Sequence, residues 1–164
     1  MNIASLSQYA KHKDGTYVAL EMDKQSREML DHFVEMNLGL DERIDPDSYH
    51  ITCCYSRTPV PAAENLMKDT TAIANAVQYE VFPTKDSGKC LVLRVESDSA
   101  SYLNGWLQKH GATSDYDEYK PHITICYEYK GSDDVSQLPL PQFPMHFDRL
   151  TVDPLDPQFV PANK

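Results

Sequence analysis

Apolar side chains recur along the first forty residues with two different periods. Residues 16–22 place apolar side chains at alternating positions, which predicts a strand. Asp23 can then cap a helix and Gly39 can end one, and the apolar residues between them lie at helical spacing: Met29, Leu30, Phe33, Val34 and Leu38. We therefore expect a strand over 16–22 and a helix over about 23–38, behind a polar and loosely held lead-in of residues 1–15.

The remaining elements follow from the same patterns. β-branched and aromatic residues predict strands over 49–55, 72–82, 89–96, 123–129 and 147–152, and residues 84–88 connect two of these as a hairpin. Asp98 can cap a helix that extends to His110. Its buried stripe is expected to consist of Tyr102, Leu103, Trp106 and Leu107.

The two halves of the chain repeat this order of elements. Each half runs from a strand through a helix and a glycine to a strand that begins His-x-Thr. Gly39 and Gly111 are 72 residues apart, and so are His50 and His122. Two copies are too few for a solenoid. We expect one α+β domain over residues 1–164, with two pseudo-symmetric lobes of antiparallel sheet that line a central cleft and carry their helices outside.

Composition narrows the class of protein. A length of 164 residues with 41% hydrophobic residues suits one globular domain. No apolar run approaches the roughly 20 residues of a membrane span, and residues 1–15 lack the apolar stretch of a secretory signal, so we expect a cytoplasmic protein with no membrane partner. The net charge of −10 argues against a broad basic face for long nucleic acid.

The four cysteines are expected to be reduced. All of them lie in apolar stretches typical of strands: Cys53, Cys54, Cys90 and Cys126. Adjacent cysteines bridge each other with difficulty, and no C-x-x-C spacing is present. We interpret these residues as small hydrophobic side chains of the core.

The repeated His-x-Thr strands carry the candidate chemistry. In a strand, His50 and Thr52 share one face, as do His122 and Thr124. A single such pair is usually structural, but packing alone does not favour an imidazole at both repeat positions. Histidine, with an ordinary pKa of about 6.5, can act as either acid or base near neutral pH. A zinc site is the alternative, and the sequence offers no obvious third ligand.

This pattern resembles the two-histidine (2H) phosphoesterase superfamily, whose members carry two H-x-[ST] motifs in a bilobal fold. The resemblance covers about residues 16–159. It implies metal-independent cleavage of a phosphoester, without a cofactor. One imidazole would accept the proton of the attacking hydroxyl, and the other would protonate the leaving oxygen. The catalytic residues implied are His50, Thr52, His122 and Thr124.

Longer stretches are similar to the phage anti-CBASS phosphodiesterases, which degrade the cyclic di- and trinucleotide signals of bacterial antiviral defence. The stretches are 79–86, 89–93 and 115–122. This resemblance implies that Tyr17 stacks on a base. It also implies that Asp153, where the family has glutamate, reads a base, and that Phe159, where the family has tryptophan, stacks on one.

These observations lead to one functional hypothesis and two alternatives. We expect a cyclic oligonucleotide phosphodiesterase that acts by 2′-OH attack in the bacterial cytoplasm. An RNA 2′,3′-cyclic phosphodiesterase is the alternative within the same class, although the net charge of −10 disfavours an RNA track. A non-catalytic protein that sequesters the nucleotide is the alternative of another class, and it would not need two complete His-x-Thr pairs.

Overall fold

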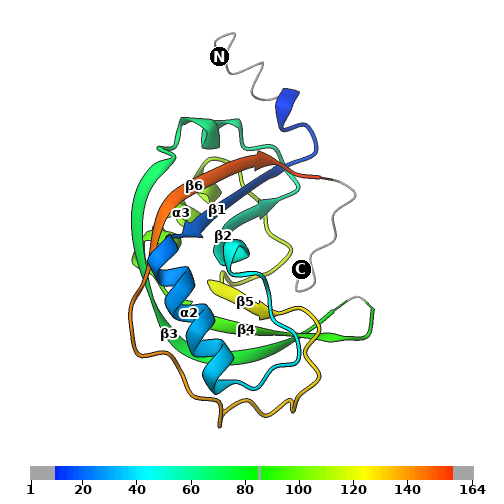
Figure 1. The fold of residues 1–164 in the computed structure, drawn as a ribbon. Coiled ribbons are helices and arrows are strands. Elements are labelled where there is room, and N and C mark those ends of the chain that lie inside the picture. Colours follow the sequence, from blue (N-terminus) through cyan, green and yellow to red (C-terminus); the bar gives the residue numbers. More distant parts are fainter. Residues whose placement is uncertain (1–9, 85, 157–164) are drawn as a thin grey trace.

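A single antiparallel sheet extends through the protein in the computed structural model, which describes residues 10–84 and 86–156 (Figure 1). Its strand order is β2-β1-β6-β3-β4-β5. The strands are β1 (Thr16–Met22), β2 (His50–Ser56), β3 (Asp69–Pro83), β4 (Lys89–Glu96), β5 (His122–Cys126) and β6 (Met145–Pro154). The helices are α2 (Lys24–Asn37) and α3 (Asp98–Lys109), with short 3-10 turns η1 (Pro46–Ser48) and η2 (Pro61–Asn65).

The sheet consists of two equivalent halves. From its edges inward, the order is β2, β1, β6 in one half and β5, β4, β3 in the other. Strand β3 joins the halves, because its first residues pair with β6 and its residues from Asn75 to Pro83 pair with β4. The sheet curves so that its edge strands β2 and β5 approach each other (Figure 1). This curvature brings the two motif strands to one place.

Several sequence predictions are confirmed. Asp23 caps α2 by accepting a hydrogen bond of 2.8 Å from the backbone N–H of Ser26. Gly39 follows the helix with a positive φ of 59°, a conformation that favours glycine. Strands β3 and β4 form the expected hairpin. The fold is the α+β arrangement that the repeat predicted, with helices outside one antiparallel sheet.

Three local predictions are wrong. Ser97, and not Asp98, caps α3, because the Ser97 hydroxyl accepts from the N–H of Ala100. Tyr102 is 71% exposed and does not belong to the buried stripe of α3, whose buried residues are Ala100 and Leu107. Strand β5 ends at Cys126 and does not continue to residue 129.

The lead-in is also more ordered than expected over its described part. His12 is completely buried, and its Nε2 lies 2.7 Å from Oε1 of Glu64. The N–H of Gly15 donates to the carbonyl of His12, and the carbonyl of Gly15 accepts from the N–H of Leu155. The segment before β1 is therefore packed against the domain from residue 12 onward.

A β-bulge follows each His-x-Thr motif. Val18 pairs with Cys54 and Ala19 pairs with Thr52, so Cys53 stands outside the register. In the other half, Leu91 pairs with Cys126 and Val92 pairs with Thr124. Ile125 therefore stands outside the strand register in the same way. Cys53 and Ile125 are 72 residues apart, so the bulge is part of the repeat. Bulges of this kind bend a strand and redirect its side chains.

The apolar face of the sheet forms one continuous core with both helices. All four cysteines are buried, Cys53, Cys54 and Cys126 of them in this core, and none forms a disulfide. Burial raises the pKa of the Cys53 thiol to about 12, so this thiol is protonated at neutral pH. Among the described helices, none is long and apolar enough to cross a membrane.

Gly15 supplies a test of this packing. It has a φ of 125°, and a Cβ at this position would overlap the carbonyl oxygen of Ser56. Because both backbone strain and a clash with main chain result, we expect Gly15→Ala to reduce the free energy of unfolding by about 3 kcal/mol. Urea denaturation followed by circular dichroism measures this change.

Gly105→Ala is the matched control. Gly105 lies inside α3, and a Cβ there has nothing within 4 Å. Alanine is the better helix former by about 1 kcal/mol, so this substitution should leave the protein as stable or make it more stable. If both alanine variants change stability alike, the close approach at Gly15 does not matter.

Candidate functional site

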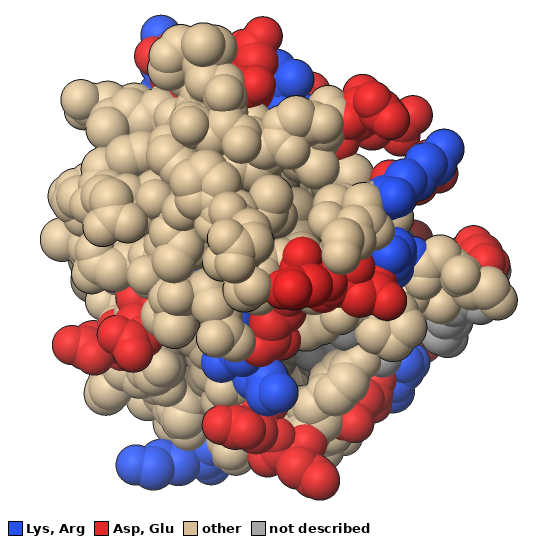
Figure 2. All heavy atoms as spheres, turned by 90° about the horizontal axis from the view of Figure 1, so that it is seen from below, with Lys and Arg blue, Asp and Glu red and all other residues tan. Residues whose placement is uncertain are grey.

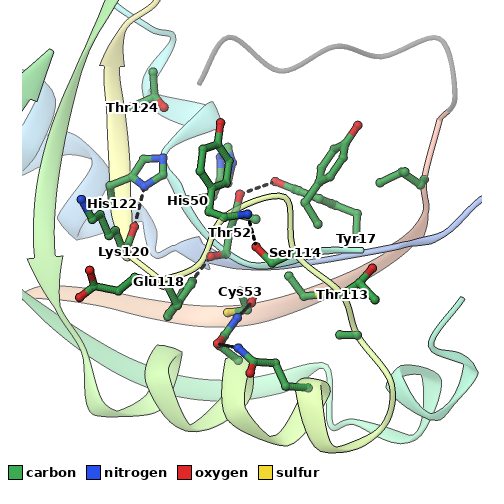
Figure 3. A pocket seen from close by; sticks show the side chains of 18 of the residues that line it. Tyr17, His50, Thr52, Cys53, Thr113, Ser114, Glu118, Lys120, His122 and Thr124 are labelled. Atoms are coloured by element: carbon green, nitrogen blue, oxygen red, sulfur yellow. Dashed lines mark hydrogen bonds between the residues drawn. The ribbon is translucent and has the colours of Figure 1, made fainter. Parts of the chain in front are cut away.

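Each motif histidine makes an equivalent hydrogen bond through its Nδ1 atom. Nδ1 of His50 lies 2.6 Å from the carbonyl oxygen of Ser48. Nδ1 of His122 lies 2.8 Å from the carbonyl oxygen of Lys120 (Figure 3). A carbonyl oxygen can only accept, so Nδ1 of each ring carries the proton and donates it. Each imidazole is thereby fixed with Nε2 as the nitrogen that can take up or release a proton in a reaction.

The two motifs open into one cavity. It has a volume of about 820 Å³ and is lined by both motif pairs: His50, Thr52, His122 and Thr124. In Figure 3, β5 brings His122 and Thr124 to one side of this space, and Thr52 and Tyr17 lie on the other. The curved sheet therefore unites residues that are 72 positions apart in the sequence.

Thr52 is held from two sides. The hydroxyl of Tyr17 lies 3.1 Å from its Oγ1, and the hydroxyl of Tyr119 donates to its carbonyl oxygen at 2.8 Å (Figure 3). Burial raises the pKa of both tyrosines, so both hydroxyls stay protonated at neutral pH. Tyr119 precedes the strand of His122, and its hydrogen bond therefore connects the second motif's segment to the first motif.

The segment between α3 and β5 forms one wall of the cavity. Its Thr113 donates a backbone hydrogen bond of 3.0 Å to the hydroxyl of Ser56, at the end of β2. Asp115 forms a salt bridge of 3.1 Å with Arg57, which follows β2. Tyr116 on this wall is 45% exposed and lines the cavity. The wall is thus attached to the strand that carries the first motif.

The residues predicted to bind the substrate occupy different positions. Tyr17 lines the cavity. Asp153 is exposed on β6 and pairs in register with Tyr17, but it is not part of the cavity lining, whereas Asp156 is. Phe159 lies outside the described residues. Within residues 10–84 and 86–156, no group of three or more His, Cys, Asp or Glu side chains could hold a metal ion.

The family relationship agrees with these motifs. Residues 14–161 match the family model described as anti-CBASS protein Acb1. The chain belongs to the Acb1 family. It is 31% identical over 114 residues to the Acb1 protein of Vibrio phage KVP40, a match that covers 70% of this chain and 73% of the relative. It is 29% identical over 122 residues to that of Enterobacteria phage T4, covering 74% and 78%.

Solved structures confirm the fold of this Acb1 family member. The protein TT0787 of Thermus thermophilus superimposes with a TM-score of 0.60 at 13% identity, over 84% of this chain and 86% of that one. Escherichia coli LigT, solved in complex with NADP+, gives a TM-score of 0.51 at 18% identity, over 84% and 85%. The chain has the bilobal 2H phosphoesterase fold.

Two cavity residues of this Acb1 family member were not predicted to act at the site. Tyr119 is close in sequence to His122, but nothing in the pattern indicates that its hydroxyl reaches Thr52. Phe82 belongs to the predicted hairpin, where an aromatic residue is ordinary. Only the strand register shows that Phe82 faces the cavity with His122.

Tyr119 is expected to position Thr52. In Tyr119→Phe the carbonyl of Thr52 loses its donor, and the bulged strand is free to shift. We expect kcat for a cyclic dinucleotide to fall about tenfold while KM changes by less than about twofold, because the lost contact would matter for transition-state geometry. Steady-state kinetics on the purified variant give both constants.

Tyr79→Phe is the control for this prediction. Tyr79 is also buried, and its hydroxyl donates to the carbonyl of Pro139 at 2.9 Å, outside the cavity. Both variants should lose about 1 kcal/mol of stability, but Tyr79→Phe should keep the wild-type kcat. Equal kcat for the two variants would show that Tyr119 has only a structural role.

Proposed function

We propose that this protein is a phosphodiesterase that cleaves 3′,5′-linked cyclic di- or trinucleotides, such as cyclic GMP–AMP, and so counteracts CBASS. The observation that carries this proposal is the pair of imidazoles at repeat-equivalent positions, held alike through Nδ1 at the edge of one cavity. Membership of the anti-CBASS protein Acb1 family supports the biological role.

The proposed reaction begins with proton transfer to one imidazole. Its Nε2 accepts the proton of the ribose 2′-OH, and the 2′-oxygen attacks the adjacent 3′-phosphorus. The bond from phosphorus to the 5′-oxygen breaks, and the other, protonated imidazole gives its proton to that leaving oxygen. The product is a linear nucleotide that ends in a 2′,3′-cyclic phosphate. Water can open this end to a 3′-phosphate with the two imidazoles in exchanged roles.

The threonines are suited to stabilise the phosphorane-like transition state. Thr52 and Thr124 lie two residues after the histidines, on the same strand face, and both line the cavity. Their hydroxyls can donate to non-bridging oxygens as negative charge develops there. When the Tyr17 hydroxyl donates to Oγ1 of Thr52, the Thr52 oxygen is held in place and its own proton is left to donate to the substrate.

Surface charge favours a small substrate over long RNA. The chain carries a formal net charge of −10. On the face shown in Figure 2, basic side chains lie singly or in small groups beside acidic ones. A long RNA backbone is bound through a continuous basic track. A compact ring with two or three phosphates needs only the local donors of the cavity.

The histidines provide the main test. We expect His50→Ala and His122→Ala each to lower kcat for cyclic GMP–AMP by about 10²–10⁴-fold, with activity of the wild type retained in EDTA. Because both groups act in one step, the double variant should be little worse than either single variant. Chromatography of the linear product measures turnover.

His146→Ala is the matched control, since His146 is exposed on β6 and outside the cavity lining. It should retain wild-type turnover. Near wild-type rates in both motif variants would place the reaction elsewhere. Tight binding of cyclic nucleotides without turnover by the wild type would identify a sequestering protein and contradict the proposal.

Base preference should depend on Asp153. A carboxylate accepts a hydrogen bond from the exocyclic amine of adenine but repels the O6 acceptor of guanine. We expect Asp153→Asn to narrow the ratio of kcat/KM for cyclic GMP–AMP over cyclic di-GMP by about tenfold, because an amide can satisfy either base. Asp148→Asn, on the same strand and also exposed, should leave the ratio unchanged. An unchanged ratio in both variants would show that Asp153 does not read the base.

A further inference from the structure

The register of the two half-sheets places equivalent residues beside each catalytic motif. Moving inward from each motif threonine, the paired positions are Thr52, Ala19 and Thr151 in one half and Thr124, Val92 and Glu80 in the other. The bulges occur at the same place in both halves, so this correspondence continues along the inner strands. Two residues further along the middle and inner strands of each half, the side chains again lie on the face of the sheet that carries the motif residues.

At that next position the two halves differ in which strand carries the aromatic ring. In the first half, Tyr17 of β1 pairs with Asp153 of β6. In the second half, Cys90 of β4 pairs with Phe82 of β3. Phe82 therefore occupies the place that Asp153 has in the first half, and Cys90 occupies the place of Tyr17. The aromatic residue has moved from the middle strand to the inner one.

Despite this exchange, each catalytic imidazole has an aromatic neighbour in nearly the same orientation. The ring centroids of Tyr17 and His50 are 6.4 Å apart, with an interplanar angle of 73°. Those of Phe82 and His122 are 5.4 Å apart, with an angle of 80°. Both aromatic rings line the cavity and both are partly exposed. A substrate near either imidazole therefore has an aromatic ring within reach.

A cyclic dinucleotide has two nucleosides on opposite sides of its phosphate ring, so a cavity that binds it needs two places for bases. Resting on the proposed function, we propose that Phe82 is the stacking platform for the second base. Aromatic stacking accepts every base, because every base has a π-face. The paired residue, Cys90, is fully buried and offers no carboxylate or amide to read the base edge. The Phe82 site is therefore tolerant of base identity, in contrast to a site that contains Asp153.

Steady-state kinetics of two Phe82 variants test this assignment. Phe82→Leu should raise KM for cyclic GMP–AMP and for cyclic di-AMP alike by about tenfold, with kcat changed by less than about threefold, because stacking stabilises the bound ground state and transition state equally. Phe82→Tyr keeps the ring and should keep KM within about twofold of the wild type. Thermal unfolding shows that each variant is folded.

Phe143→Leu is the matched control. Phe143 is also partly buried, with its ring edge-on to Phe33 at 6.1 Å, and it lies outside the cavity lining. It should leave KM unchanged. A wild-type KM for Phe82→Leu, or a fall in kcat alone, would overturn the assignment, since the latter would mean that Phe82 only packs against His122. Absence of turnover by the wild-type protein on every cyclic nucleotide would instead overturn the proposed function.

Discussion

The residue in the bulge after each motif has a main-chain carbonyl that receives no ladder hydrogen bond from the neighbouring strand. In each case the opposite lobe donates a hydrogen bond to this carbonyl. The side-chain amide of Asn104, on α3, donates to the carbonyl of Cys53 at 2.8 Å. The backbone N–H of Ile44, which follows α2, donates to the carbonyl of Ile125 at 2.8 Å. Because a buried carbonyl without a donor costs about 1–3 kcal/mol, each lobe stabilises the bend in the other lobe's motif strand.

These reciprocal hydrogen bonds between the lobes explain why the cavity can be both wide and well ordered. A cleft between two lobes would ordinarily allow them to move as separate bodies. Here, each lobe completes the hydrogen bonding of the strand that carries the other lobe's histidine and threonine. Tyr119 adds a third connection through the carbonyl of Thr52. These three hydrogen bonds, two from side chains and one from the main chain, hold the two motif strands at a fixed distance from each other.

The sequence predicted the parts of this arrangement that depend on local pattern or on the repeat. Helix α2, the β3–β4 hairpin and the His-x-Thr faces follow from periodicity, and the 72-residue spacing indicated that His50 and His122 are equivalent. The contacts of Tyr119 and Phe82 depend on pairing between distant strands, which leaves no local signal. The cap of α3 was misassigned because Ser97 and Asp98 are both good capping residues, and only the backbone at Ser97 is extended.

The position of β6 has a consequence for how the protein is made. Strand β1 lies between β2 and β6, and its Thr16 pairs with Pro154, close to the other end of the described chain. The half-sheet of β3, β4 and β5 is complete once Cys126 has been synthesised, whereas the other half lacks its inner strand until β6 follows. Contacts of such long sequence separation form late and slowly. On the ribosome, the lobe of the second histidine can therefore assemble first, and the strand of the first histidine reaches its final place only after β6 has emerged.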